Sequence, residues 1–162
     1  MKITSLLALT AALAFAAPTI AETVTVESAG IQFDSPKDWK VKKEGESVTV
    51  DSADGGVSIV FQILPGKAQD AAVKAIEDSL DKAIGKVKWG EKATSKEKVN
   101  GMDAEIWNGT AKEGKLQVEA IYLESPADKT VGIYWFDTPE SEAKNKADAD
   151  SLWKSIKPLE KK

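Results

Sequence analysis

The chain has 162 residues, a net charge of −4 at pH 7, and neither histidine nor cysteine. All its basic residues are lysines, so it lacks the arginine fork that binds phosphate or guanine in a bidentate way, and its negative charge argues against nucleic acid as a partner. Without histidine it lacks the commonest general base and transition-metal ligand, and without cysteine it can form no disulfide and carry no cysteine-linked lipid.

The N-terminus has the pattern of a secretory signal peptide. Lys2 precedes an apolar run from Ile3 to Ala17, which small residues follow. An uncleaved membrane anchor is the alternative, but the run is shorter than the roughly 20 apolar residues that span a bilayer. We therefore predict a cleaved signal peptide.

The signal predicts where the mature protein begins and where it resides. Cleavage after Ala21 would make Glu22 the new N-terminus, and a cut after Ala16 also fits the preference for small residues. We predict a signal peptide over residues 1–21 and a single periplasmic domain over residues 22–162, with no membrane span after cleavage. A domain of this size buries enough surface to fold without disulfides.

Short strands are predicted in the first part of this domain. Apolar residues alternate with polar ones there, as in strands with one buried face. They are Val24, Val26, Ile31 and Phe33, then Trp39 and Val41, then Val48 and Val50, and finally Val57, Ile59, Phe61 and Ile63, before Pro65 and Gly66 end the last strand.

The segment after Val50 has two interpretations. Asp51 and Asp54, followed by Gly55 and Gly56, place carboxylates on a tight turn, as a calcium loop does. The segment lacks the alternating acids and the distal glutamate of such loops, so we interpret it as a hairpin turn.

A helix is predicted between Ala68 and Ile84, where the apolar period becomes helical. Gly85 follows at the position of a helix C-cap. The apolar stripe consists of Ala72, Val73, Ile76, Leu80, Ala83 and Ile84.

The Asn-Gly pair at 100–101 predicts a hairpin and its register. A two-residue turn at this pair sets Lys98 opposite Asp103 and Lys96 opposite Glu105, which gives two cross-strand ion pairs. Agreement of both pairs with one register supports the turn.

The remaining pattern predicts a sheet that is apolar on both faces. A turn near Gly114 would set Trp107 opposite Ala120, with apolar side chains then on both sides of each strand up to Phe136. A second helix begins with Thr138 as N-cap and Pro139 in its first turn. Its proposed buried side is Ala143, Ala147, Ala149, Leu152, Trp153 and Ile156. Because such a sheet must be covered twice, we predict an α+β three-layer sandwich, an antiparallel sheet flanked by helices on both faces.

This layout resembles the PsbP-type family. The resemblance extends from Ile31 to Pro158 and rests on Phe33, Ser35, Pro36, Trp39, the Gly101 hairpin, Ser155 and Ile156. It implies non-enzymatic accessory roles: plant members assist the oxygen-evolving photosystem, a fold relative binds a small GTPase, and bacterial members are often secreted or lipid-anchored. The family has no shared catalytic motif, so the resemblance assigns no residue a catalytic, metal or cofactor role.

Tryptophans are the candidate binding residues. Of the five, at positions 39, 89, 107, 135 and 153, four fall on predicted core faces or a buried turn, where packing is their ordinary role. Trp89 is flanked by polar residues near a sheet edge. Because aromatic side chains also anchor ligands and partners, we name Trp89, Trp107 and Trp135 as possible contacts.

Three functions remain open. The first is a secreted non-enzymatic accessory protein that contacts another protein through a surface or edge of its sheet. The second is a periplasmic carrier of a small apolar ligand held between sheet and helix. The third is a histidine-free hydrolase that works with two carboxylates, although no pair of acids stands out in the sequence. Four Ser-x-x-Lys patterns lack the companion motifs of serine acyl enzymes, so we predict no catalytic residue and no cofactor.

Overall fold

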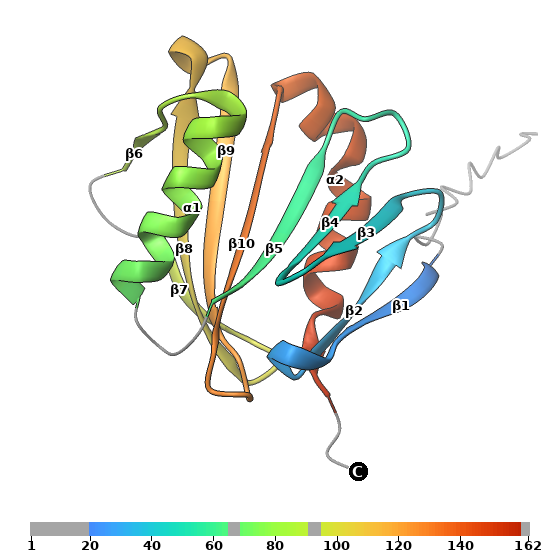
Figure 1. Cartoon of the computed structure of the whole chain (residues 1–162). Helices are drawn as coiled ribbons and strands as arrows, with labels where there is room; N and C mark the ends of the chain where they lie inside the picture. The colour runs from blue at the N-terminus through green and yellow to red at the C-terminus, as the bar shows by residue number, and fades with distance from the viewer. Residues whose placement is uncertain (1–19, 65–68, 91–94, 160–162) are drawn as a thin grey trace, which may run out of the picture.

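The computed structural model describes residues 20–64, 69–90 and 95–159. Two predictions lie outside the described residues: the signal peptide up to residue 19, which includes the alternative cut after Ala16, and the strand end at Pro65 and Gly66. The described part is an α+β fold with two antiparallel sheets and two α-helices (Figure 1). The helices are α1 (Gln69–Ile84) and α2 (Pro139–Ser155), and two short 3-10 turns, η1 (Glu27–Ala29) and η2 (Lys112–Gly114), join strands.

The larger sheet has eight strands and the smaller has three. In the larger sheet the order is β3 (Lys40–Glu44), β4 (Ser47–Asp51), β5 (Ser58–Leu64), β10 (Thr130–Asp137), β9 (Leu116–Glu124), β8 (Met102–Ala111) and β6 (Lys88–Trp89), and β7 (Ser95–Val99) also pairs with β8. In the smaller sheet the order is β1 (Ile20–Val26), β2 (Ile31–Pro36) and β11 (Lys157–Pro158).

The predicted hairpin register is confirmed. Lys98 pairs with Asp103 and Lys96 with Glu105 across β7 and β8. The two predicted ion pairs form, with Nζ–carboxylate distances of 2.6 Å and 2.7 Å respectively. Trp107 also lies opposite Ala120, as the second turn predicts.

One face of the large sheet packs against α1. Ile76, Leu80 and Ile84 of the helix form a core cluster with side chains of β8, β9 and β10. Gly132 permits this close approach, because a Cβ at that position would lie only 2.5 Å from Ile76 Cδ1. Ala83, which the helical stripe included, is exposed.

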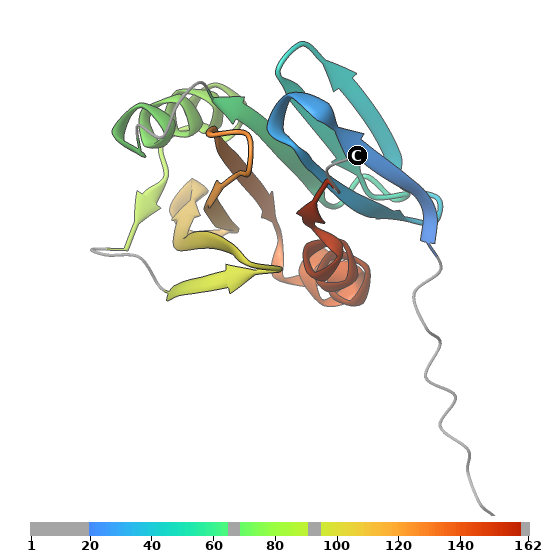
Figure 2. The ribbon, with the colours of Figure 1, turned by 90° about the horizontal axis from the view of Figure 1, so that it is seen from below.

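The other face packs against the small sheet together with α2. Phe33 of β2 stacks on Phe61 of β5 with ring centroids 4.3 Å apart and an interplanar angle of 2°. Leu152 of α2 and Ile156 join the same core cluster. Seen from below, the small sheet and α2 lie together and away from α1 (Figure 2).

The α+β class and the antiparallel sheet are confirmed, whereas two finer expectations need correction. The small sheet, which the sequence pattern did not predict, shares the cover of one face with α2. On α2, Ala143 and Ala147 are exposed and Asn145 is buried, so the buried side of the helix is narrower than predicted.

The predicted N-cap of α2 is confirmed, since the Ser141 N–H donates to Thr138 Oγ1 over 3.2 Å.

The acidic segment after β4 is a hairpin turn, as predicted. Asp54 Oδ1 accepts hydrogen bonds from the Gly56 N–H (3.0 Å) and the Ser52 hydroxyl (2.8 Å). Asp54 Oδ2 forms an ion pair with Lys144 of α2. These contacts hold the pKa of Asp54 well below its usual range. Its carboxylate therefore fixes the turn and connects it to α2.

The end of α2 is held by the turn between β7 and β8. The Asn100 side-chain amide donates to the carbonyl oxygens of Lys154 (3.1 Å) and Ile156 (2.6 Å). Asn100 has a φ of 48°, the left-handed conformation that this turn requires. The residue thus serves both the hairpin and the C-terminal end of the helix, whose carbonyls lack partners within the helix.

Substitution of Asn100 separates these two roles. Asn100→Ala is expected to lower the free energy of unfolding by about 2–3 kcal/mol. It removes two hydrogen bonds, and it places alanine in the left-handed conformation, which alanine tolerates less well than asparagine does. Asn100→Gly keeps the turn and should lose about 1–2 kcal/mol. Urea unfolding followed by tryptophan fluorescence measures both values. A glycine variant as stable as the original chain would show that the two hydrogen bonds contribute nothing.

Candidate functional site

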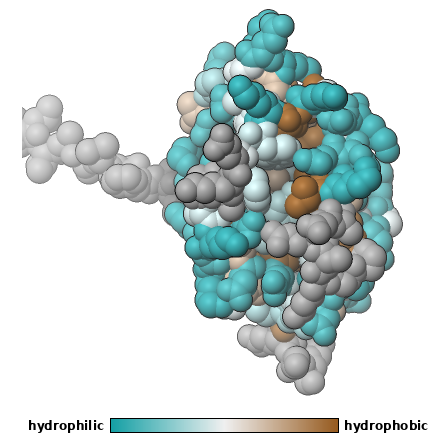
Figure 3. Space-filling model, turned by 90° about the vertical axis from the view of Figure 1, so that its left-hand side faces the viewer, coloured by the Kyte–Doolittle hydropathy of each residue, from teal (hydrophilic) through white to brown (hydrophobic). Residues whose placement is uncertain are grey.

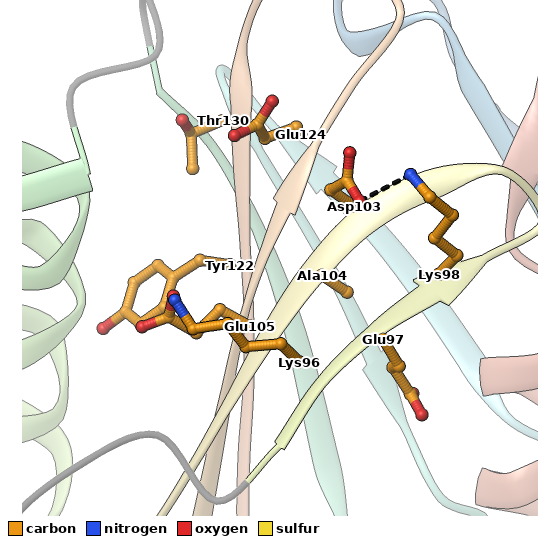
Figure 4. Close-up of a pocket in the computed structure, with 9 residues that line it drawn as sticks. All are labelled: Lys96, Glu97, Lys98, Asp103, Ala104, Glu105, Tyr122, Glu124 and Thr130. Carbon is orange, nitrogen blue, oxygen red and sulfur yellow. Dashed lines mark hydrogen bonds and ion pairs between the residues drawn. The ribbon is translucent and has the colours of Figure 1, made fainter.

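Two concave regions are candidates for a functional site. The first, which we call the hollow, is open and about 650 Å³ in volume. Strands β7 to β10 contribute its lining, shown in Figure 4, which consists of Lys96, Glu97, Lys98, Asp103, Ala104, Glu105, Tyr122, Glu124 and Thr130.

Charged groups of both signs dominate the hollow. The Lys96–Glu105 pair lies beside Tyr122, which is directly opposite Glu105 on the neighbouring strand (Figure 4). Burial, with Glu77 and Glu105 nearby, raises the pKa of Tyr122, so its phenol stays protonated. The hollow therefore presents lysines and carboxylates to whatever contacts it, while Tyr122 in its lining is only 6% exposed.

The second region, which we call the cleft, lies between α2 and the large sheet and has a volume of about 270 Å³. Its apolar lining includes the buried side chains of Val57, Ile59, Ile133 and Leu152. Trp135 comes from β10 and Trp153 from α2, and both are half-buried. The cleft thus has an aromatic side chain from the sheet and another from the helix.

Carboxylates also line the cleft. Glu119 and Asp137 belong to the sheet, whereas Glu142 and Asp150 belong to α2. Lys146 is the basic residue of this lining, and its Nζ lies 3.1 Å from Asp150 Oδ1. Four acids thus face one lysine.

Burial perturbs the two sheet carboxyls. It raises the pKa of Glu119 to about 7, and Glu142, Asp137 and Glu97 add to the increase while Lys146 opposes it. Burial and the nearby Glu142 raise the pKa of Asp137 to about 6. Both carboxyls therefore change their charge within the pH range of ordinary experiments.

The fold around these regions has known counterparts. No family model matches the sequence, and no curated protein matches it. Among solved structures, the chain is similar to cyanobacterial PsbP (CyanoP) from Synechocystis, with a TM-score of 0.58 at 12% identity and coverage of 94% of this chain and 99% of that one. The chain has the PsbP-like fold.

Two further structures share this PsbP-like fold. LpqN of Mycobacterium tuberculosis has a TM-score of 0.54 at 14% identity, with coverage of 80% of this chain and 83% of LpqN. A protein from Bacteroides thetaiotaomicron has a TM-score of 0.56 at 13% identity, and the match covers 88% of this chain and 50% of that protein. The three similarities establish the fold.

The structure separates the three tryptophans named from the sequence. Trp89 lies in β6 opposite Gly109, where a Cβ would come within 2.8 Å of Trp89 Cε3. Trp107 packs with the α1 cluster and donates through Nε1 to Glu105 Oε1 over 2.9 Å. Trp135 lies in the cleft on the other face of the sheet. Trp89 and Trp107 thus share one face of the PsbP-like sheet, without Trp135.

Sequence reasoning missed Glu119 and Asp137. A signal for Glu119 was available, because it interrupts an apolar strand face that continues with Ile121 and Leu123. Its neighbours could not be predicted, since Trp135 lies opposite it on β10 and Glu142 comes from α2.

The predicted cleavage bond between Ala21 and Glu22 falls within β1, and the pairing of β1 with β2 continues from Glu22 onwards.

Glu119 predicts how stability depends on pH. Its folded pKa of about 7 lies above the ordinary value of 4.5, so the cost of burying its charge is absent below about pH 4.5 and complete above about pH 7. The free energy of unfolding should fall across this window, by on the order of 1 kcal/mol after allowance for solvent screening. Glu119→Gln should remove this part of the fall, and urea unfolding at several pH values measures it.

The matched control is Glu44→Gln, at an exposed position at the end of β3. This variant should keep the pH dependence of the original chain. A Glu119→Gln variant that is less stable than the original at about pH 8 would contradict the assignment of a costly buried carboxylate.

Proposed function

We propose that the chain is a secreted, non-enzymatic accessory protein that binds another protein through the hollow. The observation that carries this proposal is the shape and charge of the hollow, which is wide, open, and lined by lysines, acids and Tyr122 from neighbouring strands. A surface of this kind suits a polar protein contact, in which mixed charges provide specificity.

The edges of the large sheet favour side-chain contact over strand addition. Strand β7, at one edge, carries Lys96 and Lys98, and β3, at the other, carries Lys40, Lys42 and Lys43. Lysines on edge strands oppose pairing with another chain. The side of the molecule that carries α1 and β6 is also mostly hydrophilic, with few hydrophobic residues among the polar ones (Figure 3).

The proposed location is the cell envelope, as a periplasmic protein whose large sheet is covered by α1 on one face and by α2 with the small sheet on the other. Support comes from the signal-like N-terminus and from LpqN, which has the same fold and is described as involved in cell envelope biogenesis. Within the described ranges, no helix combines the length and the apolar character needed to cross a bilayer.

The carrier hypothesis is supported less well in its apolar form. The cleft has tryptophans and an apolar floor, but its rim holds four acids, which disfavour a purely apolar ligand. The hydrolase hypothesis would have to use Glu119 and Asp137, because carboxyls of raised pKa are suited to acid–base work. Our proposal gives these two carboxyls no catalytic role.

The first test concerns secretion. Expression of the full chain in a Gram-negative host, followed by mass spectrometry of the periplasmic fraction, is expected to yield a protein that begins at Glu22. A charged residue before the cut should block processing, so Ala21→Arg should retain the longer mass. Full-length protein that remains in the membrane fraction would contradict a cleavable signal.

The second test concerns the hollow. Because the chain lacks cysteine, one cysteine introduced by Lys98→Cys can carry a photoactivatable crosslinker, and Lys40→Cys on the opposite edge is the matched control. Crosslinking in the host periplasm should give one discrete product from Lys98→Cys. Excess unlabelled chain and high salt should both reduce that product, since the contact is specific and charged.

Either of two results would overturn this proposal. One is an equal pattern of products from both labelled positions, and the other is a product from Lys98→Cys that excess unlabelled chain does not reduce.

A further inference from the structure

The cleft, which is distinct from the hollow, holds carboxylates with too few cations to balance them. No hydrogen bond or ion pair joins the side chain of Glu119, Asp137 or Glu142 to another described residue. Lys146 lies 3.1 Å from Asp150, so the lysine of the cleft is already paired. At neutral or higher pH this arrangement leaves an excess of negative charge in a partly enclosed space.

Strand register brings two of these carboxylates to the same tryptophan. Glu119 lies directly opposite Trp135 in the pairing of β9 with β10, and Asp137 follows Trp135 by two residues on the same face. Opposite residues in antiparallel strands have Cβ atoms about 4.5–5.5 Å apart, and diagonal neighbours about 7–8 Å apart. Glu119 and Asp137 thus lie close enough to contact one small molecule on Trp135.

The remaining surfaces of the cleft are apolar or aromatic. Trp153 and Ala149 come from α2, and the floor is formed by Val57, Ile59 and Ile133. Tryptophan faces attract cations through the ring quadrupole, and apolar floors hold methyl and methylene groups. A volume of about 270 Å³ suits a molecule of modest size.

We propose that the cleft binds a small organic cation, with its ammonium group between Glu119, Asp137 and Trp135 and its apolar part on the floor. A bound ammonium neutralises carboxylates that the protein itself leaves unbalanced. Trp135 and Trp153 exclude water and supply cation–π attraction. This site is independent of the protein contact proposed for the hollow, so either proposal can fail without the other.

The site should bind only when its carboxylates are ionised. The charged groups that face Glu119 are Glu142 and Lys146 of α2, Asp137 of β10 and Glu97 of β7, and Glu142 also faces Asp137. All of these groups except Lys146 favour the neutral, protonated form of the carboxyl that they face. Protons therefore compete with the cation, and affinity should rise with pH through the range from about 6 to 7.

The test uses probes matched in shape. Choline and neohexylamine both carry a positive charge, and neohexyl alcohol is a neutral isostere of choline. Isothermal titration calorimetry on the mature protein at about pH 8 is expected to detect both cations, with the alcohol at least about tenfold weaker. At about pH 5 the affinity for choline, which stays charged, should fall at least about tenfold.

Variants assign the binding to the cleft. Glu119→Gln and Trp135→Leu should each weaken choline binding about tenfold, whereas Glu44→Gln on the distant β3 should leave it unchanged. Glu119→Gln is expected to be at least as stable as the original chain, so a loss of binding in this variant cannot be attributed to unfolding. Resonances of the Trp135 and Trp153 indole groups should shift on titration in NMR spectra.

Three results would overturn the proposal. The first is that neither cation binds at millimolar concentration at about pH 8. The second is that neohexyl alcohol binds as tightly as choline, which would instead favour an apolar carrier. The third is that Glu44→Gln weakens binding as much as Glu119→Gln does.

Discussion

The eight-stranded sheet is apolar on both faces, and this constraint determines where the other elements lie. On one face Ile76 of α1 packs above Gly132. On the other face the small sheet and α2 share the cover, and the stack of Phe33 on Phe61 joins the two sheets. An antiparallel sheet of this kind has no solvent-facing side, so each covering element contributes directly to the stability of the whole domain.

The cleft exists because the cover on the second face is incomplete. Helix α2 contributes few large apolar side chains to the core, since Ala143 and Ala147 are exposed and Asn145 occupies a buried position. Trp135 and Glu119 of the sheet are therefore only half-buried beneath it. Burial raises the pKa of Glu119, while the incomplete cover leaves the same carboxyl partly exposed to solvent, and this combination gives the region its chemistry.

Local chemistry in the sequence predicted much of the fold. The turn at 100–101 set the pairing of β7 with β8, and Thr138 with Pro139 marked the start of α2, because these signals depend on neighbouring residues alone. The small sheet could not be predicted, since β11 is two residues long and pairs with a strand more than a hundred positions earlier. The cleft was missed for the same reason, as its lining comes from strands and a helix whose contact depends on tertiary packing. Of the named tryptophans, only Trp135 lies in it.

The small sheet joins the two ends of the domain, since Lys157 of β11 pairs with Gln32 of β2. Leu159 also donates its N–H to the Gly30 carbonyl over 2.9 Å. The order of synthesis therefore matters: β1 and β2 leave the ribosome first, but the sheet they begin is complete only after residues 157–159 emerge. Contacts of such long sequence separation slow folding, because the cost of closing the long loop between them must be met before they form. Until residues 157–159 have paired with β2 and its neighbouring turn, the small sheet does not complete its cover of the second face of the large sheet.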